Sequence, residues 1–143
     1  MMNEEVRRIM SPNPPTINPE QSVIDVSYLM LEKNFQQLPV VDEGKFIGLV
    51  TSHDLWKKYE NNPTLKHLKV KDVMNTHVIK LSPKDKVGTA AELFADKRFK
   101  TLPVVNLRNE LKGVVTAFDL IKVAFNAEYE NPILYKEAFK ATI

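Results

Sequence analysis

Apolar residues follow two kinds of spacing along the chain, and the same alternation between them occurs twice. Residues 22–33 carry apolar side chains at helical spacing, which predicts a helix. Two short apolar runs, 38–41 and 46–51, flank the turn sequence 42–45 and predict a β-hairpin. Helical spacing returns over 52–59. Because Thr16-Ile17 also predicts a short strand before the first helix, this half has the predicted order β-α-β-β-α.

The second half repeats this order. A short strand is expected at 79–81, then a helix that starts near Ser82, a hairpin whose second strand is 111–116, and a helix over about 117–125. We therefore divide the chain into a first repeat, a second repeat and a C-terminal extension that is predicted to be partly helical, with the boundaries 1–64, 65–130 and 131–143.

Two tracts recur almost literally in the two repeats. Leu-Pro-Val-Val contains Pro39 in the first copy and Pro103 in the second, 64 residues later (103 − 39). Gly-(apolar)-Val-Thr-x-x-Asp starts at Gly48 and again at Gly113, 65 residues later (113 − 48). The copies therefore differ by one residue in the intervening turn. A unit of about 65 residues buries little of its surface alone, so we expect the two repeats to pack on each other.

Composition restricts the class of protein. The 143 residues are 43% hydrophobic and 27% charged, which is typical of a folded globular chain. A net charge of +2 from scattered lysines does not predict a nucleic-acid surface. The absence of cysteine excludes disulfides and thiolate chemistry. Since no apolar run reaches the ~20 residues of a membrane span and the N-terminus is acidic, unlike a signal peptide, we expect a cytoplasmic protein without membrane association.

The two Thr-x-x-Asp sequences are the strongest candidates for binding chemistry. Thr51 and Asp54, like Thr116 and Asp119, stand where a predicted strand passes into a helix. A helix N-terminus offers free N–H groups to a phosphate, and a nearby carboxylate accepts hydrogen bonds from ribose hydroxyls. The same spacing also suits a capping box, which needs no ligand. Both interpretations remain open, and they are compatible.

On these tracts the chain resembles two tandem cystathionine-β-synthase (CBS) motifs, together called a Bateman module, over about residues 6–125. Each copy has a Val-x-x-x-Met turn before a short strand, then Leu-Pro-Val-Val and Gly-x-Val-Thr-x-x-Asp-Leu. The resemblance implies an α/β fold of two β-α-β-β-α repeats related by a pseudo-two-fold axis. It also implies two clefts between the repeats that bind AMP, ADP, ATP or S-adenosylmethionine, a regulatory role without catalysis, and pairing into homodimers.

The resemblance adds further site residues. It places Thr16 and Lys80 on strands that line the clefts, with Pro15 and Ile79 beside the adenine ring, although all four are also ordinary edge-strand residues. His53 and Lys100 are the cations at positions where the family meets phosphate, and so few cations favour few phosphates. The predicted nucleotide-binding residues are Pro15, Thr16, Thr51, His53, Asp54, Ile79, Lys80, Lys100, Thr116 and Asp119.

No sequence motif indicates an enzyme or a metal site. The chain lacks a phosphate-binding P-loop, a dinucleotide fingerprint, a nucleophile elbow and a zincin motif, and its three histidines have no metal-ligand spacing. We therefore expect no catalytic residues, no metal and no required cofactor. Asp54 and Asp119 also have no sequence-evident base or nucleophile as a partner.

Apolar helix faces predict an interface. Leu55, Trp56 and Tyr59, and the residues of 120–125, offer more apolar surface than one small repeat covers, which indicates a homodimer. Alternatively, residues 133–143 cover that surface and the protein is a monomer. Two other functions remain open: a structural dimerisation module without a ligand, and a regulatory subunit whose effector protein is a separate chain.

Overall fold

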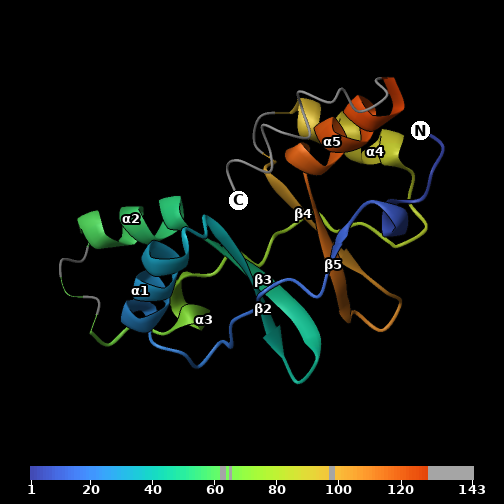
Figure 1. Cartoon of the computed structure of the whole chain (residues 1–143). Coiled ribbons are helices and arrows are strands. Elements are labelled where there is room, and N and C mark those ends of the chain that lie inside the picture. The colour runs from blue at the N-terminus through green and yellow to red at the C-terminus, as the bar shows by residue number, and fades with distance from the viewer. Residues whose placement is uncertain (62–63, 65, 97–98, 129–143) are drawn as a thin grey trace.

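The computed structural model describes residues 1–61, 64, 66–96 and 99–128, and the elements form two similar halves side by side (Figure 1). The elements of the first half of the sequence are η1 (Val6–Arg8), β1 (Ser11–Pro12), α1 (Val23–Lys33), β2 (Gln37–Asp42), β3 (Lys45–Thr51) and α2 (Ser52–Asn61). Those of the second half are α3 (Val70–Val73), α4 (Val87–Ala95), β4 (Thr101–Val105), β5 (Leu111–Thr116) and α5 (Ala117–Glu128). The predicted α/β fold with a repeated order of elements is confirmed. The extension 131–143 lies outside the described residues.

Local sequence explains where the helices begin and end. Ser22 precedes α1, and its hydroxyl accepts the Ile24 N–H at 3.2 Å, while Asn34 ends the helix with a φ of 56°. The helix predicted to start near Ser82 instead begins at Val87. The intervening residues form a turn in which the Asp85 carboxylate accepts the Ser82 N–H at 2.8 Å.

The two hairpins match each other in detail. β2 pairs with β3 and β4 with β5, both antiparallel, and each pairing shifts register at the same place, between Val40 and Val41 and between Val104 and Val105. Gly44 takes a φ of 80° in the first turn, as its position in a predicted tight turn required. The hairpins therefore present Thr51 and Thr116 at equivalent strand ends.

The predicted short strands are single bridging residues. Ile17 pairs in parallel with Val40, and Leu81 pairs in parallel with Val104, without a longer ladder. The prediction of a strand at Thr16-Ile17 and at 79–81 was therefore too long. Around Ile17 the flanking prolines lack the N–H groups that would extend the pairing.

The N-terminal segment packs on the second repeat. Val6 is fully buried in the core that contains Leu102 and Val115, and its N–H donates to the Asp85 carbonyl at 2.7 Å. β1 then adds to the edge of β5, with Ser11 opposite Val114. In Figure 1 this segment runs beside α4 and β5, away from α1.

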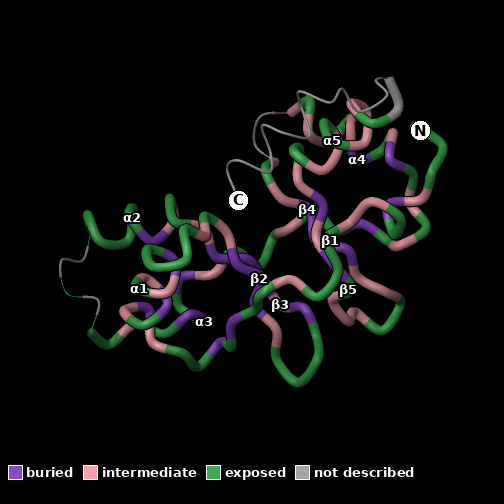
Figure 2. Tube along the Cα trace, viewed as in Figure 1, coloured by how far each residue is buried: buried purple, intermediate pink, exposed green. Residues whose placement is uncertain are grey.

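The segment that follows the first repeat, which contains α3, packs in turn on the first repeat. α3 contributes Val70 and Val73 to the core of the first repeat, which also contains Val26 and Val50. Asn75 then pairs with Leu49 in β3 through hydrogen bonds of 2.8 and 3.0 Å. Residues 76–80 consequently cross from the first hairpin to the second, and the buried stretches of Figure 2 form a separate core in each half.

This crossing explains the repeated glycine. A Cβ at Gly48 would lie 3.0 Å from the Asn75 carbonyl oxygen, and one at Gly113 would lie 2.7 Å from the Ser11 carbonyl oxygen. Each glycine therefore lets the segment from the other half lie directly against its strand. The crossing segments then lie next to the ends of β3 and β5, where the candidate site residues are.

Candidate functional site

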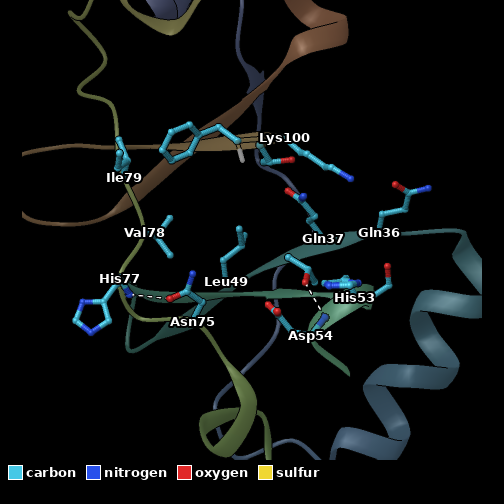
Figure 3. A pocket seen from close by; sticks show the side chains of 14 residues that line it. Gln36, Gln37, Leu49, His53, Asp54, Asn75, His77, Val78, Ile79 and Lys100 are labelled. Carbon is cyan, nitrogen blue, oxygen red and sulfur yellow. Dashed lines mark hydrogen bonds between the residues drawn. The ribbon is translucent and has the colours of Figure 1, made fainter. Parts of the chain in front are cut away.

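A cleft of about 590 Å³ opens where β3 passes into α2, between the two repeats (Figure 3). Both repeats contribute to its walls. The lining residues are Gln36, Gln37, Leu49, Thr51, Ser52, His53, Asp54, Asn75, His77, Val78, Ile79, Phe99, Lys100 and Thr101. Five of the predicted site residues are among them: Thr51, His53, Asp54, Ile79 and Lys100.

One end of the cleft is polar. The Thr51 hydroxyl accepts the Asp54 N–H at 3.0 Å, and the Gln36 carbonyl accepts the Ser52 N–H at 2.9 Å. Of the first three N–H groups of α2, only that of His53 then has no partner among the described residues. Lys100 is exposed on the same side of the cleft. This end therefore offers one N–H group and one ammonium group to a negatively charged ligand group.

The other end combines an apolar surface with the polar side chains of Asn75 and His77. Val78 and Ile79 lie on the crossing segment, on the opposite side of the cleft from Lys100 and Gln36 (Figure 3). Ile79 is 43% exposed, and Leu49 contributes apolar surface from β3. An exposed apolar side chain on a cleft wall suits the flat face of an aromatic ring, so the two ends match a ligand with a base and a charged tail.

The two aspartates differ in their hydrogen bonds. The Asp119 carboxylate accepts the Thr116 N–H at 2.8 Å while the Thr116 hydroxyl accepts the Asp119 N–H at 3.2 Å, which is a complete capping box. In the first repeat only the bond to the Thr51 hydroxyl is present. Within the described residues the Asp54 carboxylate has no hydrogen bond or ion pair, so it is free to accept from a ligand.

The remaining predicted site residues do not line this cleft. Pro15 and Thr16 are exposed on the other crossing segment, which runs from β1 to Ile17 and is the counterpart of 76–80. With Thr116 and Asp119 they stay a prediction for a second, equivalent site.

Lys80 is directed elsewhere. Its ammonium lies 3.3 Å from the Asn109 carboxamide oxygen and 6.0 Å from the centre of the Phe46 ring. The Asn109 carboxamide in turn donates to the Phe46 carbonyl at 2.7 Å. Lys80 therefore contacts the junction of the two hairpin turns, where the repeats touch, and not the cleft.

The resolved pKa shifts lie outside the cleft. Hydrogen bonds from Lys69, at 2.8 Å, and Lys71, at 3.0 Å, hold the pKa of Glu20 below its usual range. The pKa of Lys69 is raised by the same contact with Glu20. These exposed ion pairs connect the start of α3 to the turn before α1, and they support the exchange of segments between the repeats.

Sequence reasoning missed several residues of the cleft, chiefly Asn75, His77 and Val78. His77 and Val78 belong to the crossing segment 76–80, and Asn75 directly precedes it. Only the pairing of Asn75 with Leu49 brings these residues against β3. A usable signal was present in Gly48, because a glycine inside an apolar strand indicates the close approach of another backbone. The local sequence around Gly48 does not show which segment of the chain approaches it.

Two further properties concern the part of the chain that the structure describes. No three His, Asp or Glu side chains gather there as a metal site would require. None of the helices described is long and apolar enough to cross a membrane.

Two repeats that exchange segments around an inter-repeat cleft define a tandem-repeat α/β module, and comparison with known proteins gives the family. The family model for the CBS domain matches residues 6–55 and 70–126, so the chain belongs to the CBS-domain family. CBS pairs are regulatory modules.

Two solved structures and one curated relative illustrate the similarity. CBSX2 of Arabidopsis thaliana, solved in complex with AMP, is 26% identical with a TM-score of 0.77, over 87% of this chain and 98% of that one. The CBS pair of protein MJ0100, solved with 5′-methylthioadenosine and S-adenosylmethionine, is 27% identical with a TM-score of 0.72, over 85% and 99%. The uncharacterized protein MJ1232 of Methanocaldococcus jannaschii is 29% identical over 81% of this chain, which spans only 38% of that protein.

Proposed function

We propose that this protein is a regulatory module that binds an adenosine-containing ligand in the cleft between its repeats and transmits its occupancy to a partner protein. The free carboxylate of Asp54 carries the proposal. It lies in the wall of a cleft that has an apolar surface at one end and a cation at the other. A ribose between those ends would supply two hydroxyl donors to the Asp54 carboxylate.

Related structures support the ligand class. CBSX2 was solved with AMP, and the MJ0100 pair with S-adenosylmethionine and 5′-methylthioadenosine. These ligands share an adenosyl group and differ in the tail on the ribose. AMP, ADP, ATP and S-adenosylmethionine are accordingly the ligands to test. Lys100, the one Lys or Arg among the described lining residues, favours a small charge on the tail.

Calorimetric titration of Asp54→Asn against the parent protein tests the proposal. Loss of a charged acceptor of ribose hydroxyls should cost about 1.5–3 kcal/mol of binding free energy. Asp72→Asn is the matched control, because that carboxylate accepts the Lys69 N–H at 2.8 Å at the start of α3 and does not line the cleft. If the parent binds none of the four ligands, or if Asp54→Asn binds them unchanged, the cleft is not an adenosyl site.

One observation favours a second function, dimerisation. Tyr28, Leu31, Trp56 and Tyr59 are exposed on the outer face of α1 and α2. Leu31, Trp56 and Tyr59 line an apolar groove of about 540 Å³. A structural module without a ligand would use this face and leave the cleft unused, so the titration distinguishes the two functions.

A further inference from the structure

Gln37 lies in the cleft wall with an unsatisfied polar atom. Its Oε1 atom is shielded from solvent and accepts no hydrogen bond from any described residue. A buried acceptor without a partner lowers the stability of the protein that holds it, because it has lost its hydrogen bonds to water. Such a group at a binding site suggests that a ligand supplies the missing donor.

The position of Gln37 defines which part of a ligand it meets. It begins β2 and lies directly opposite Thr51 in the β2–β3 register. It is therefore next to the N-terminus of α2, at the polar end of the cleft, and Figure 3 shows its side chain on the same side as Lys100. Gln37 lines the cleft and is only partly buried, but its Oε1 atom is shielded, so contact with a ligand requires a change of side-chain rotamer.

The chemistry at this end requires both a negative group and a donor. The His53 N–H and the Lys100 ammonium suit an anion, whereas Gln37 Oε1 needs an N–H or O–H group. Phosphate oxygens accept hydrogen bonds and, when ionised, offer no donor. An α-amino acid group has both parts, a carboxylate and an ammonium, on neighbouring atoms.

The charge of the wall agrees with a zwitterion. Among the described residues that line the cleft, Lys100 is the one Lys or Arg and Asp54 is the one carboxylate. A nucleoside triphosphate would bring about four negative charges to this single lysine. An α-amino acid tail brings one positive and one negative charge.

We propose that Gln37 makes the cleft selective for an adenosyl ligand with an α-amino acid tail, as in S-adenosylmethionine, over nucleoside phosphates. The inference rests on the proposed adenosyl site and assigns the recognition of its tail. The ammonium of the tail donates to Gln37 Oε1, and the carboxylate meets the His53 N–H and Lys100. Binding thus satisfies the acceptor that is unsatisfied in the free protein.

Gln37→Met tests this assignment because it removes the carboxamide and keeps the length of the side chain. We expect the melting temperature of the ligand-free protein to rise by a few degrees, since the unsatisfied acceptor is gone. Calorimetry should show S-adenosylmethionine weakened on the order of tenfold. The affinity for 5′-methylthioadenosine, which has the same adenosyl group without the amino acid, should not change comparably.

Two further variants sharpen the result. Gln37→Glu keeps an acceptor and adds a negative charge, so it should retain S-adenosylmethionine and weaken AMP. Gln36→Met is the matched control: Gln36 lines the same cleft but is exposed, and we expect an unchanged melting temperature.

The outcomes separate this inference from the proposed function. A parent protein that binds none of these ligands contradicts both. A parent that binds AMP or 5′-methylthioadenosine but not S-adenosylmethionine overturns the role of Gln37 alone. The role of Gln37 is also overturned if Gln37→Met weakens the binding of S-adenosylmethionine and 5′-methylthioadenosine equally or changes neither. A Gln37→Met variant whose melting temperature does not rise overturns it as well.

Discussion

At the scale of single residues, the N-terminus of α5 is closed by two reciprocal hydrogen bonds between Thr116 and Asp119, whereas α2 has only one of them. Asp119→Ala should therefore lower the free energy of unfolding by about 1 kcal/mol, the usual value of an N-terminal cap. Asp54→Ala should lower it by less, because its carboxylate has no partner among the described residues. Denaturant titration of the ligand-free variants measures both unfolding free energies. Equal losses of stability in Asp119→Ala and Asp54→Ala would contradict the difference between the two caps.

Lys100 and Lys80 form a second pair for comparison, because only Lys100 lines the cleft. Lys100→Ala should weaken a ligand with an anionic tail, such as AMP, on the order of tenfold and adenosine much less. Lys80→Ala should leave both affinities unchanged, since its ammonium contacts Asn109 and the Phe46 ring. Calorimetric titration of both variants with AMP and adenosine measures these affinities. A loss with Lys80→Ala would return Lys80 to the site, as the sequence predicted.

At the scale of elements, the N-terminal segment should stabilise the second repeat and not the first. Val6 is fully buried in the second core, and β1 pairs with β5. Deletion of residues 1–10 should therefore accelerate amide hydrogen exchange in β4, β5 and α4 more than in β2 and β3. The milder change Val6→Ala should cost about 1–3 kcal/mol of unfolding free energy. Faster amide hydrogen exchange chiefly in the first repeat would contradict the packing of the N-terminal segment on the second repeat.

The same elements show how much of the fold local sequence predicts. Helices and hairpins follow from spacing, capping residues and turns within a few positions, so α1 and β5 were predicted within one residue of their bounds. The exchange was not predictable, because the spacing of apolar residues around Val6 and Val70 shows that they are buried but not in which core. The short strands at Ile17 and Leu81 were predicted too long for a related reason: pairing length depends on the neighbour.

The candidate site likewise contains residues that the sequence predicts and residues that only the packing of the chain reveals. Thr51 and Asp54 were predicted because a strand end and a helix start are local features. Lys100 was predicted because it stands where the family meets phosphate. Asn75 and Gln37 were not predicted as binding residues. The first depends on a segment from the other repeat, and the second on a buried atom that only packing reveals.

At the scale of the whole molecule, the outer faces of the helices predict a homodimer. Tyr28 is 68% exposed, Trp56 58%, and Ile121 62%, and Trp56 stacks on Tyr59 with ring centres 5.8 Å apart. Burial of such aromatic surface is a strong contribution to association. Light scattering at micromolar concentration should give a dimer, and Trp56→Glu should give a monomer.

Leu107 provides the control for that experiment. It is fully exposed at the β4–β5 turn, away from these helices, so Leu107→Glu should leave the dimer intact. Residues 131–143 lie outside the described residues, and their deletion tests whether they cover the helices. A full-length monomer would contradict the dimer, and a monomer that dimerises only after deletion would assign that segment as a cover.

The crosswise placement of the segments around η1 and α3 also determines the order in which the protein completes its folding during synthesis. The first core can close as soon as α3 has left the ribosome, because α3 is its last contribution in the sequence. The second core needs the first strand made, β1, and the last, β5, with Ser11 opposite Val114. Closing so long a loop is slow, and the early segment must stay unpaired until β5 has been synthesised. A stall in translation before β5 would therefore leave a nascent chain with one folded repeat and a free N-terminal strand, which is the species that chaperones would recognise.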